Sequence, residues 1–328
     1  MHNCAHFSQD HIMESIEKKR ILTKIAGLYY IENQTQQKIA ERLNISRTKV
    51  SRYLDKARKE KIVEIKINLR KEDYSNLENS IEKKFNIKEC IVVPTYENME
   101  ETLKAMAGPL NDLLERILEN GSSLGIGWGN SLKGISDYID VRSKSGIKVI
   151  PIIGGLGKTG TGVHTNSVAR NIADRLGGVS YMIHSPAVLD TKEIREVVEK
   201  DSNISQVIKL TETIDTAMVG LSDIGLDSTL IKTGSFSPEE FKYLENLGVV
   251  GDINLIFIDE KGRPVPNKID ERIVRISPEK LKKVKKVIGV AFGRRKLKVI
   301  LGALRGRFIN ILFTDEETAS NINKMDKQ

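Results

Sequence analysis

Cysteine is scarce in this chain of 328 residues, which has only Cys4 and Cys90. Cys4 lies in an N-terminal stretch that we expect to be loose and Cys90 in a candidate strand, so no structural disulfide is expected. Histidines are scattered, and no cluster has metal-ligand spacing. His2, His6 and His11 could bind a metal weakly, but a polar leader is favoured. We therefore expect a reducing compartment and no metal or other cofactor.

Long apolar runs are also missing. No run approaches the roughly 18 residues that a membrane span needs, and the start of the chain has no signal-peptide pattern. Internal repeats and low-complexity segments are absent as well. These absences predict a soluble cytoplasmic protein without a membrane partner.

Positive charge is in excess, with a formal net charge of +8. Basic residues clearly outnumber acidic ones between Lys18 and Lys66, so we expect one end of the chain to hold a polyanion. The hydrophobic content of 39% is enough for one small and one large domain.

Residues Gln36–Ala57 carry two short helical stripes on either side of an abrupt break at Asn44 and Ile45. Ser46 is a good N-cap for the second helix. Its apolar inner face and basic, hydroxyl-rich outer face suit a recognition helix in the major groove of double-stranded DNA. The alternative is an ordinary helical hairpin with a solvated face. The candidate DNA-binding residues are Thr35, Gln36, Ser46, Arg47, Thr48, Lys49, Ser51 and Arg52.

Three segments complete the N-terminal organisation. Residues 1–16 are expected to be a leader, and Lys19–Ile31 a helix that supports the DNA-reading pair. Residues Ile62–Leu69 alternate largely at period two, which predicts a short wing strand. The sequence therefore predicts a winged helix-turn-helix domain over residues 17–70.

Residues 71–328 alternate short apolar runs with helical periods. This pattern predicts a mostly parallel, Rossmann-like α/β sheet covered on both faces. The expected strands are Glu89–Pro94, Ser123–Ile126, Lys148–Ile153, Val179–Ile183, Thr216–Leu221, Ile253–Ile258, Val287–Ala291 and Phe308–Phe313. The expected helices include Tyr74–Phe85, Glu100–Leu118, Ser131–Tyr138, Asn166–Leu176, Lys192–Lys200, Pro238–Leu247, Arg295–Leu304 and Glu316–Asn323.

Glycine-rich loops follow several of these strands, where open α/β sheets bind ligands. Gly125–Ser131 could present backbone N–H groups to a phosphate, although tight-turn packing explains the pattern equally well. Residues Ile153–Thr161 contain Gly-Lys-Thr, but Ile152 occupies the position of the first P-loop glycine, so ATP binding is rejected. Phe292–Lys296 brings cationic side chains to the same edge. Together these loops predict a pocket for a small phosphorylated polyol.

The order and spacing of these motifs resemble those of SorC/DeoR-type bacterial transcriptional regulators, whose effector domain resembles sugar-phosphate isomerases. The similarity covers nearly the whole chain beyond the leader. It is carried by Gln36–Leu54, Gly127–Gly129, Pro151–Gly155, Asn166–Arg170, Ser185–Ala187, Val219–Gly225, Gly251–Ile253, Leu301–Gly306 and Leu312–Asp315.

This resemblance implies a DNA-binding domain joined to a sugar-phosphate effector-binding and oligomerisation domain over residues 71–328, in a homo-oligomer (dimer or tetramer). Phe292 departs from the small residue that relatives commonly have, which weakens the assignment of a phosphate contact to Lys296. Whether Lys158 contacts the effector is left open. The effector-binding residues that the resemblance implies are Gly127, Trp128, Gly129, Asn130, Ser131, Gly154, Gly155, Arg170, Asp223, Asp252 and Lys296.

Packing explains some of these residues equally well: Trp128 can be a core residue, and Arg170 can pair with Asp174 four residues on. The favoured hypothesis is a transcriptional regulator of a carbohydrate operon, more readily a repressor than an activator, which responds to a phosphorylated sugar and is not an enzyme. The alternative is a sugar-phosphate isomerase or deaminase with a DNA-binding appendage. No compact acid–base group is evident around His164, His184 or the candidate acids.

Overall fold

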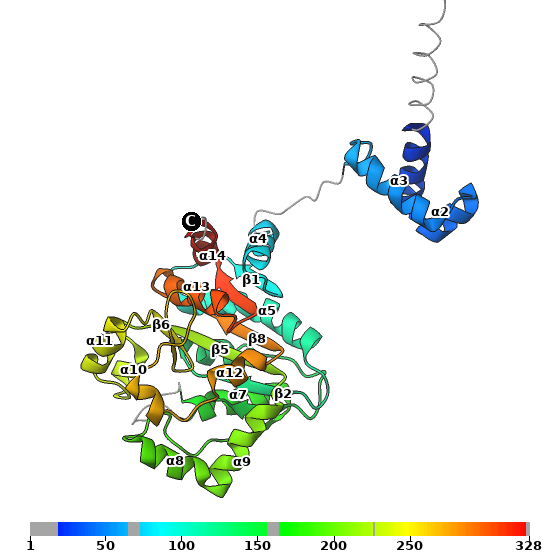
Figure 1. Cartoon of the computed structure of the whole chain (residues 1–328). Coiled ribbons are helices and arrows are strands. Elements are labelled where there is room, and N and C mark those ends of the chain that lie inside the picture. The colour runs from blue at the N-terminus through cyan, green and yellow to red at the C-terminus, as the bar shows by residue number, and fades with distance from the viewer. Residues whose placement is uncertain (1–18, 65–72, 156–163, 226, 326–328) are drawn as a thin grey trace, which may run out of the picture. The chain divides into compact units, whose positions relative to one another are not determined.

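The computed structural model describes residues 19–64, 73–155, 164–225 and 227–325 (Figure 1). These residues form two compact units, one on either side of the boundary between Arg70 and Lys71.

The described part of the N-terminal unit is built from three helical segments. The first is helical from residue 19 and ends in a π-helical turn, η1 (Gly27–Ile31), which confirms the expected supporting helix. It is followed by α2 (Gln36–Leu43) and α3 (Arg47–Lys59). Apolar side chains from all three segments meet in one small core. Its fully or almost fully buried members include Ile25, Leu28, Ile39, Ala40, Val50 and Leu54.

The break between α2 and α3 has the expected local causes. Asn44 adopts the left-handed conformation, with φ 52°, and its N–H bonds back to the carbonyls of Ala40 and Glu41. The Ser46 hydroxyl then accepts a hydrogen bond of 3.2 Å from the N–H of Lys49. One helix is therefore closed and the next is capped within three residues, as a helix-turn-helix requires.

Most of the expected wing strand lies outside the described residues, which end at residue 64 and resume at 73. Ile62 and Val63 form a bend and pack against Leu22, Ala26 and Ala57. The wing therefore stays a prediction.

The described part of the C-terminal unit contains seven parallel strands, in the order β1-β9-β8-β5-β2-β3-β4. This arrangement confirms the expected mostly parallel α/β sheet. The strands are β1 (Glu89–Val93), β2 (Ser123–Ile126), β3 (Lys148–Pro151), β4 (Val179–Ser180), β5 (Thr216–Asp223), β8 (Lys286–Val290) and β9 (Ile311–Asp315).

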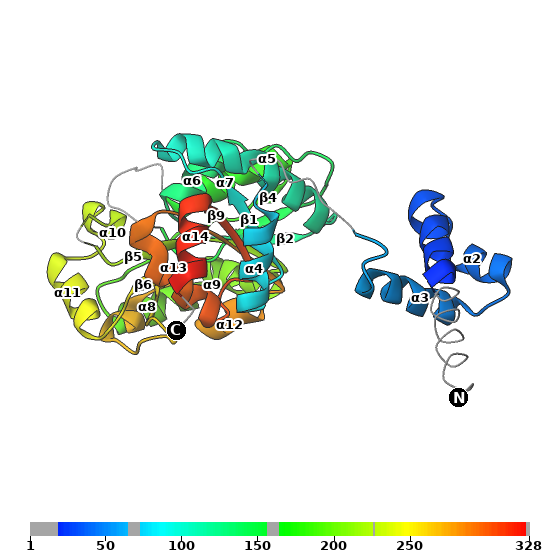
Figure 2. The same cartoon turned by 90° about the horizontal axis from the view of Figure 1, so that it is seen from above.

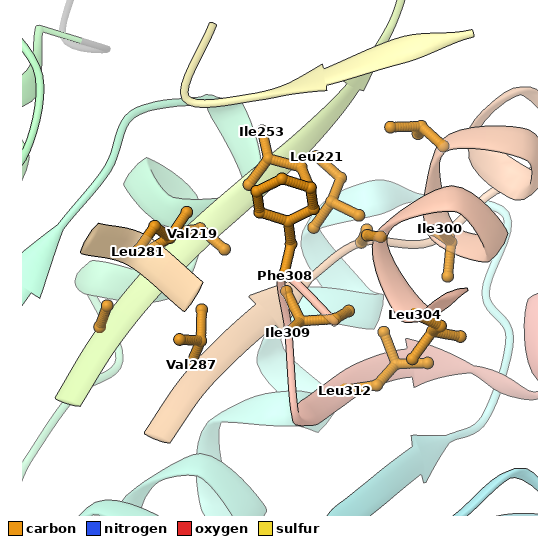
Figure 3. Close-up of a cluster of buried hydrophobic side chains, with 14 of the residues drawn as sticks. Val219, Leu221, Ile253, Leu281, Val287, Ile300, Leu304, Phe308, Ile309 and Leu312 are labelled. Carbon is orange, nitrogen blue, oxygen red and sulfur yellow. The ribbon is translucent and has the colours of Figure 1, made fainter. Parts of the chain in front are cut away.

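Helices cover both faces of this sheet (Figure 2). Alternate residues of β5 divide between the two resulting cores: Val219 faces one and Met218 the other. The first core lies beneath α4 (Ser75–Phe85), α12 (Pro278–Lys283), α13 (Leu297–Arg305) and α14 (Glu316–Met325). The second lies beneath α5 (Met99–Ile117), α6 (Asn130–Ser136) and α7 (Thr165–Leu176). Figure 3 shows part of the first core around Phe308, which is fully buried.

The prediction of a single strand over Ile253–Ile258 is wrong. These residues contribute to a hairpin of β6 (Gly251–Ile253) and β7 (Ile256–Ile258), and β6 pairs antiparallel with the end of β5. Asn254 and Leu255 form its two-residue turn, with φ values of 52° and 59°. Positive φ at both positions is the geometry of a type I′ hairpin turn. In the sequence, the apolar residues on either side of this turn make the whole segment resemble a single strand.

Four further α-helices lie in the described part of the C-terminal unit. They are α8 (Lys192–Lys200), α9 (Ser202–Leu210), α10 (Thr229–Lys232) and α11 (Pro238–Asn246). Phe236 and Phe241, from the α10–α11 segment, share a third core with Trp128, Leu255 and Phe257, so this segment packs on the hairpin beside the main sheet.

Candidate functional site

The outer face of α3 is exposed in the described part of the N-terminal unit. Val50 and Leu54 are buried against the other helices, whereas Arg47 and Arg52 are exposed. Neither arginine has an ion pair among the described residues, while Arg58 near the end of the same helix is held by Asp55 at 3.0 Å. Of the predicted DNA-binding residues on this segment, Ser51 is half-buried and the others are exposed. The exposed ones are Ser46, Arg47, Thr48, Lys49 and Arg52.

A hollow of about 560 Å³ lies beside the start of α3. It brings the predicted residues Thr35 and Gln36, at the start of α2, together with Arg47. The Thr35 hydroxyl caps α2 by accepting from the N–H of Lys38 at 3.3 Å. Tyr29 and Tyr30 also line the hollow. Hydroxyl, amide and guanidinium groups therefore face one concave surface, which suits contact with a phosphate backbone.

The C-terminal unit has a cavity of about 370 Å³ at the carboxyl ends of its central strands. Strands β2 and β5 are neighbours in the sheet. From β2 the chain continues to β3, towards one edge of the sheet, and from β5 it continues to β8, towards the other edge. Ligands of open α/β sheets bind at such a switch point. The cavity is lined by Met99, Trp128, Gly129, Asn130, Ser131, Gly220, Leu221, Ser222, Asp223, Asp227, Ser228, Thr229, Phe292, Gly293, Arg294, Arg295 and Lys296.

The loop after β2 supplies four of its five predicted residues to this cavity: Trp128, Gly129, Asn130 and Ser131. Trp128 also has the packing role, because only 3% of its surface is exposed and it belongs to the third core. Asn130 donates a hydrogen bond of 3.0 Å to the hydroxyl of Thr229, which ties this loop to the start of α10.

Gly127, the fifth residue of that loop, is not among the lining residues. A side chain on Gly127 would overlap the amide of Asn254 in the β6–β7 turn. The absence of a Cβ at Gly127 therefore makes room for the hairpin directly behind the cavity wall.

Three consecutive basic residues form the short helical turn η4 (Arg294–Lys296), which precedes α13 at the cavity. Arg294 pairs with Glu317 at 2.5 Å, and Arg295 bridges Asp223 and Asp227 at 3.1 Å each. Within the described parts of the chain, the Lys296 ammonium has no such partner. Burial lowers the pKa of Lys296, although the nearby carboxylates of Asp223 and Asp252 oppose this effect.

Asp252 is the most perturbed acid in this region. It is 1% exposed, and one carboxylate oxygen accepts a hydrogen bond of 2.8 Å from the N–H of Leu255. Burial raises its pKa to about 7, even though this hydrogen bond and the charge of Lys296 act in the opposite direction. Asp252 does not line the cavity, but its charge acts on Lys296, which does.

The remaining predicted effector residues lie elsewhere. Gly154 packs against the backbone of Pro186 and Ala187, and Gly155 lies against His164. Arg170 is exposed on α7, 4.0 Å from Asp174, which is the structural pairing considered as its alternative. The structure brings none of these residues to the cavity lining, and Lys158 lies outside the described residues.

Sequence reasoning missed several lining residues, including Ser228 and Thr229. A Ser-Thr pair before a short apolar stretch is a usable N-cap signal, and the Ser228 hydroxyl indeed caps α10. Met99 carries no chemical signal of this kind. Asn254 was hidden inside the segment that was predicted as a single strand.

Metal-binding clusters and membrane-spanning helices are both missing from the described ranges. Across the described ranges, no group of three or more His, Cys, Asp or Glu side chains could hold a metal ion. None of the helices in those ranges combines the length and apolarity needed to span a bilayer.

Comparisons with known proteins agree on one group of relatives. Residues 70–323 match the family described as "Putative sugar-binding domain". The sorbitol operon regulator of Klebsiella pneumoniae is 34% identical over 95% of this chain and 100% of its own length. The deoxyribonucleoside regulator of Bacillus subtilis is 29% identical over 92% of this chain and 97% of its own.

Solved structures give the same result. The crystal structure of the full-length sorbitol operon regulator SorC from Klebsiella pneumoniae superposes with a TM-score of 0.73 at 34% identity. The match covers 93% of this chain and 99% of that one, so it includes both the N-terminal helices and the α/β unit.

Proposed function

Because this chain belongs to the SorC/DeoR family of transcriptional regulators with a sugar-binding domain, we propose that it controls a carbohydrate-metabolism operon in response to a phosphorylated sugar. In this proposal α3 reads operator DNA in the cytoplasm, and the cavity of the C-terminal unit holds the effector. We further propose that the protein is a repressor and works as a homo-oligomer, since one helix-turn-helix contacts too few base pairs for specific binding.

The observation that carries this proposal is the unpartnered Lys296 ammonium at the cavity, within the described part of the chain. The Lys296 side chain is half-buried, and the carboxylates of Asp223 and Asp252 act on it without forming an ion pair, so a phosphate could supply the direct charged hydrogen bond that the ammonium lacks. Asn130, Ser131, Ser228 and Thr229 add amide and hydroxyl groups around the same space, which suits a polar ligand of small size. The cavity of about 370 Å³ is within the range that holds such ligands.

The proposal includes binding without turnover. Catalytic isomerisation needs an acid or base that reaches the substrate's carbonyl region. His164 and His184 do not line the cavity, and Asp252 is closed to solvent. The two carboxylates that do line it, Asp223 and Asp227, are both paired with Arg295. A coupled assay with pentose and hexose phosphates that detected steady turnover would contradict this part of the proposal.

Thermal unfolding of the full chain tests effector binding. The probes are inorganic phosphate, glycerol 3-phosphate, ribose 5-phosphate and sorbitol 6-phosphate, with unphosphorylated ribose and sorbitol as controls. A ligand at 100 times its Kd adds about 2.7 kcal/mol of stability, which is a readily measured shift in Tm. We expect at least one phosphate ester to stabilise the protein, and Lys296→Ala to abolish that shift. If neither result is seen, the proposed effector class is wrong.

A further inference from the structure

Helix α8 turns apolar side chains towards solvent. It lies with α9 at the lower edge of the C-terminal unit in Figure 1. None of its residues is buried, and Ile194 and Val197 are 43% and 70% exposed. A surface helix ordinarily buries its apolar stripe against the core, so the outward position of these two side chains requires an explanation.

Charged side chains lie on the opposite side of this helix. Arg195 and Glu199 form an ion pair of 3.3 Å, and their side chains are only 24% and 29% exposed. Lys192 reaches Glu271, which lies outside α8, at 3.7 Å. With 3.6 residues per turn, these three α8 residues point away from the direction of Val197. Charge pairs therefore occupy the inner side of α8, and its apolar side chains are left outside.

Two more charges lie beside the apolar side chains. Glu193 and Lys200 are both exposed, and neither takes part in the ion pairs that α8 forms within the described residues. They are seven residues apart, which is about two helical turns, so they lie on the same side of the seam that Ile194 and Val197 form. Apolar seams flanked by charges at this spacing are typical of paired helices. We call these four residues the α8 face.

We propose that the α8 face binds the α8 face of a second copy of this chain, as an antiparallel pair about a two-fold axis. This inference rests on the proposed function, which includes a homo-oligomer. In such a pair, Ile194 of each copy packs on Val197 of the other, and Glu193 of each copy lies opposite Lys200 of the other. The same surface thus supplies both the apolar partner and the counter-charges.

The charge pattern favours this occupant over others. α8 carries equal numbers of acidic and basic residues, whereas DNA or an anionic lipid surface would be held by a basic excess. A strongly acidic or basic protein would likewise meet one like charge on the α8 face. Reversal of the helix exchanges the positions of Glu193 and Lys200, so a reversed copy presents the complement of this face.

The contact is small. Stable, specific interfaces bury about 800 Å² on each partner, whereas α8 has nine residues. We therefore expect the α8 face to serve the weaker step in assembly of the homo-oligomer, where a change of charge has a measurable effect on association.

The test exchanges the two charges in the full chain. Sedimentation equilibrium measures the Kd of the weakest association step for wild type, Glu193→Lys, Lys200→Glu and the double variant E193K/K200E. Each single change sets like charges opposite each other at two symmetric places, so we expect the Kd to rise at least about tenfold. The double variant restores opposite charges, and its Kd should return close to that of wild type.

Two further variants separate the pairing from local effects. Glu101→Lys is the matched control, because Glu101 is also an exposed acid in the first turn of a helix, α5. It should associate as wild type does. Val197→Ser tests the apolar seam. Serine and valine have similar helix propensities and Val197 is exposed, so the fold should be kept while the Kd rises.

The possible failures are distinguishable. Single charge variants that associate like wild type, or a double variant that does not recover, would overturn the α8 contact and leave the proposed function standing. A change in Tm without any change in association would place the α8 face against this chain's own residues and would overturn the contact as well. A wild-type protein that is monomeric at every concentration would overturn both the contact and the proposed homo-oligomer.

Discussion

Gly127 is the residue at which packing and the site meet most closely. An added Cβ would overlap the Asn254 amide, so Gly127→Ala forces the hairpin or the loop to move. Overpacking of this kind costs about 1–3 kcal/mol. We expect a lower Tm and weaker ester binding. Gly108→Ala is the control, because Gly108 lies in α5 with nothing within 4 Å of an added Cβ. It should raise the Tm slightly through helix propensity. Equal Tm values for wild type and Gly127→Ala would contradict the close contact.

Asp252 makes stability depend on pH. Its pKa rises from the ordinary 3.8 to about 7 on folding, so the folded state holds a proton that the unfolded chain has already released. Stability contributed by this group is therefore complete below about pH 4 and is lost progressively as pH rises towards 7.

The Asp252→Asn variant isolates this effect. Its amide oxygen can still accept from Leu255, but it does not titrate. The difference in unfolding free energy between variant and wild type should grow in favour of the variant from pH 4 to pH 7 and then level off. A difference that is constant over this range would show that Asp252 is charged in the folded protein.

Single residues were predictable from the sequence where a local rule applies. Trp128, Asn130, Asp223 and Lys296 follow predicted strands, and all four line the cavity. The contact of Asn254 with Gly127 could not be predicted, because it depends on a hairpin that returns the chain to that residue. That contact joins positions far apart in the sequence, and no periodicity reports it.

At the scale of elements, α3 is the helix that we expect to contact DNA. Arg47→Ala and Arg52→Ala each remove a cation that has no ion pair in the described structure. We expect each variant to bind DNA more weakly and to show a smaller dependence on salt, by about one counter-ion, in mobility-shift titrations. Arg58→Ala is the matched control on the same helix, since its charge is already held by Asp55. An effect of Arg58→Ala as large as that of the other two would argue against a specific face.

Most elements were predictable because each has its own sequence signal. β2 and α8 agree with the expected bounds, and α2 and α3 are separated by the expected break at Asn44. The hairpin was not predictable, because Asn254-Leu255 lacks the glycine that usually marks a two-residue turn. The short helices α10 and α12 were also missed. Each has fewer than seven residues, which is too short to show a helical period.

At the scale of the whole molecule, the sequence contains two kinds of organisation. The basic excess and the paired stripes predict a DNA-binding unit, and strand–helix alternation predicts a parallel sheet that carries a site at its carboxyl edge. Both predictions follow from patterns within short windows of the sequence. The order of the strands cannot be predicted from such windows, because it depends on which strands pair after the chain has collapsed. It places β2 beside β5 and so creates the cavity.

Regulation requires the two units to be thermodynamically linked. An effector changes operator affinity only as far as it binds the DNA-competent and DNA-incompetent states differently. Couplings of this kind are typically about 5- to 150-fold. By linkage, operator DNA must change the affinity for the effector by the same factor. Effector Kd values measured with and without operator should therefore differ, and identical values would exclude coupling through equilibrium binding.

The most direct test is a mobility-shift titration of the full chain on an operator selected from random duplexes, at fixed salt. It is repeated with saturating amounts of the phosphate ester that stabilises the protein most, for wild type and for Lys296→Ala. We predict that the ester shifts the operator Kd of wild type at least about fivefold, within the usual range of coupling, and leaves that of Lys296→Ala unchanged. Failure of the wild-type chain to bind any selected duplex, or an equal ester response in both proteins, would contradict this account.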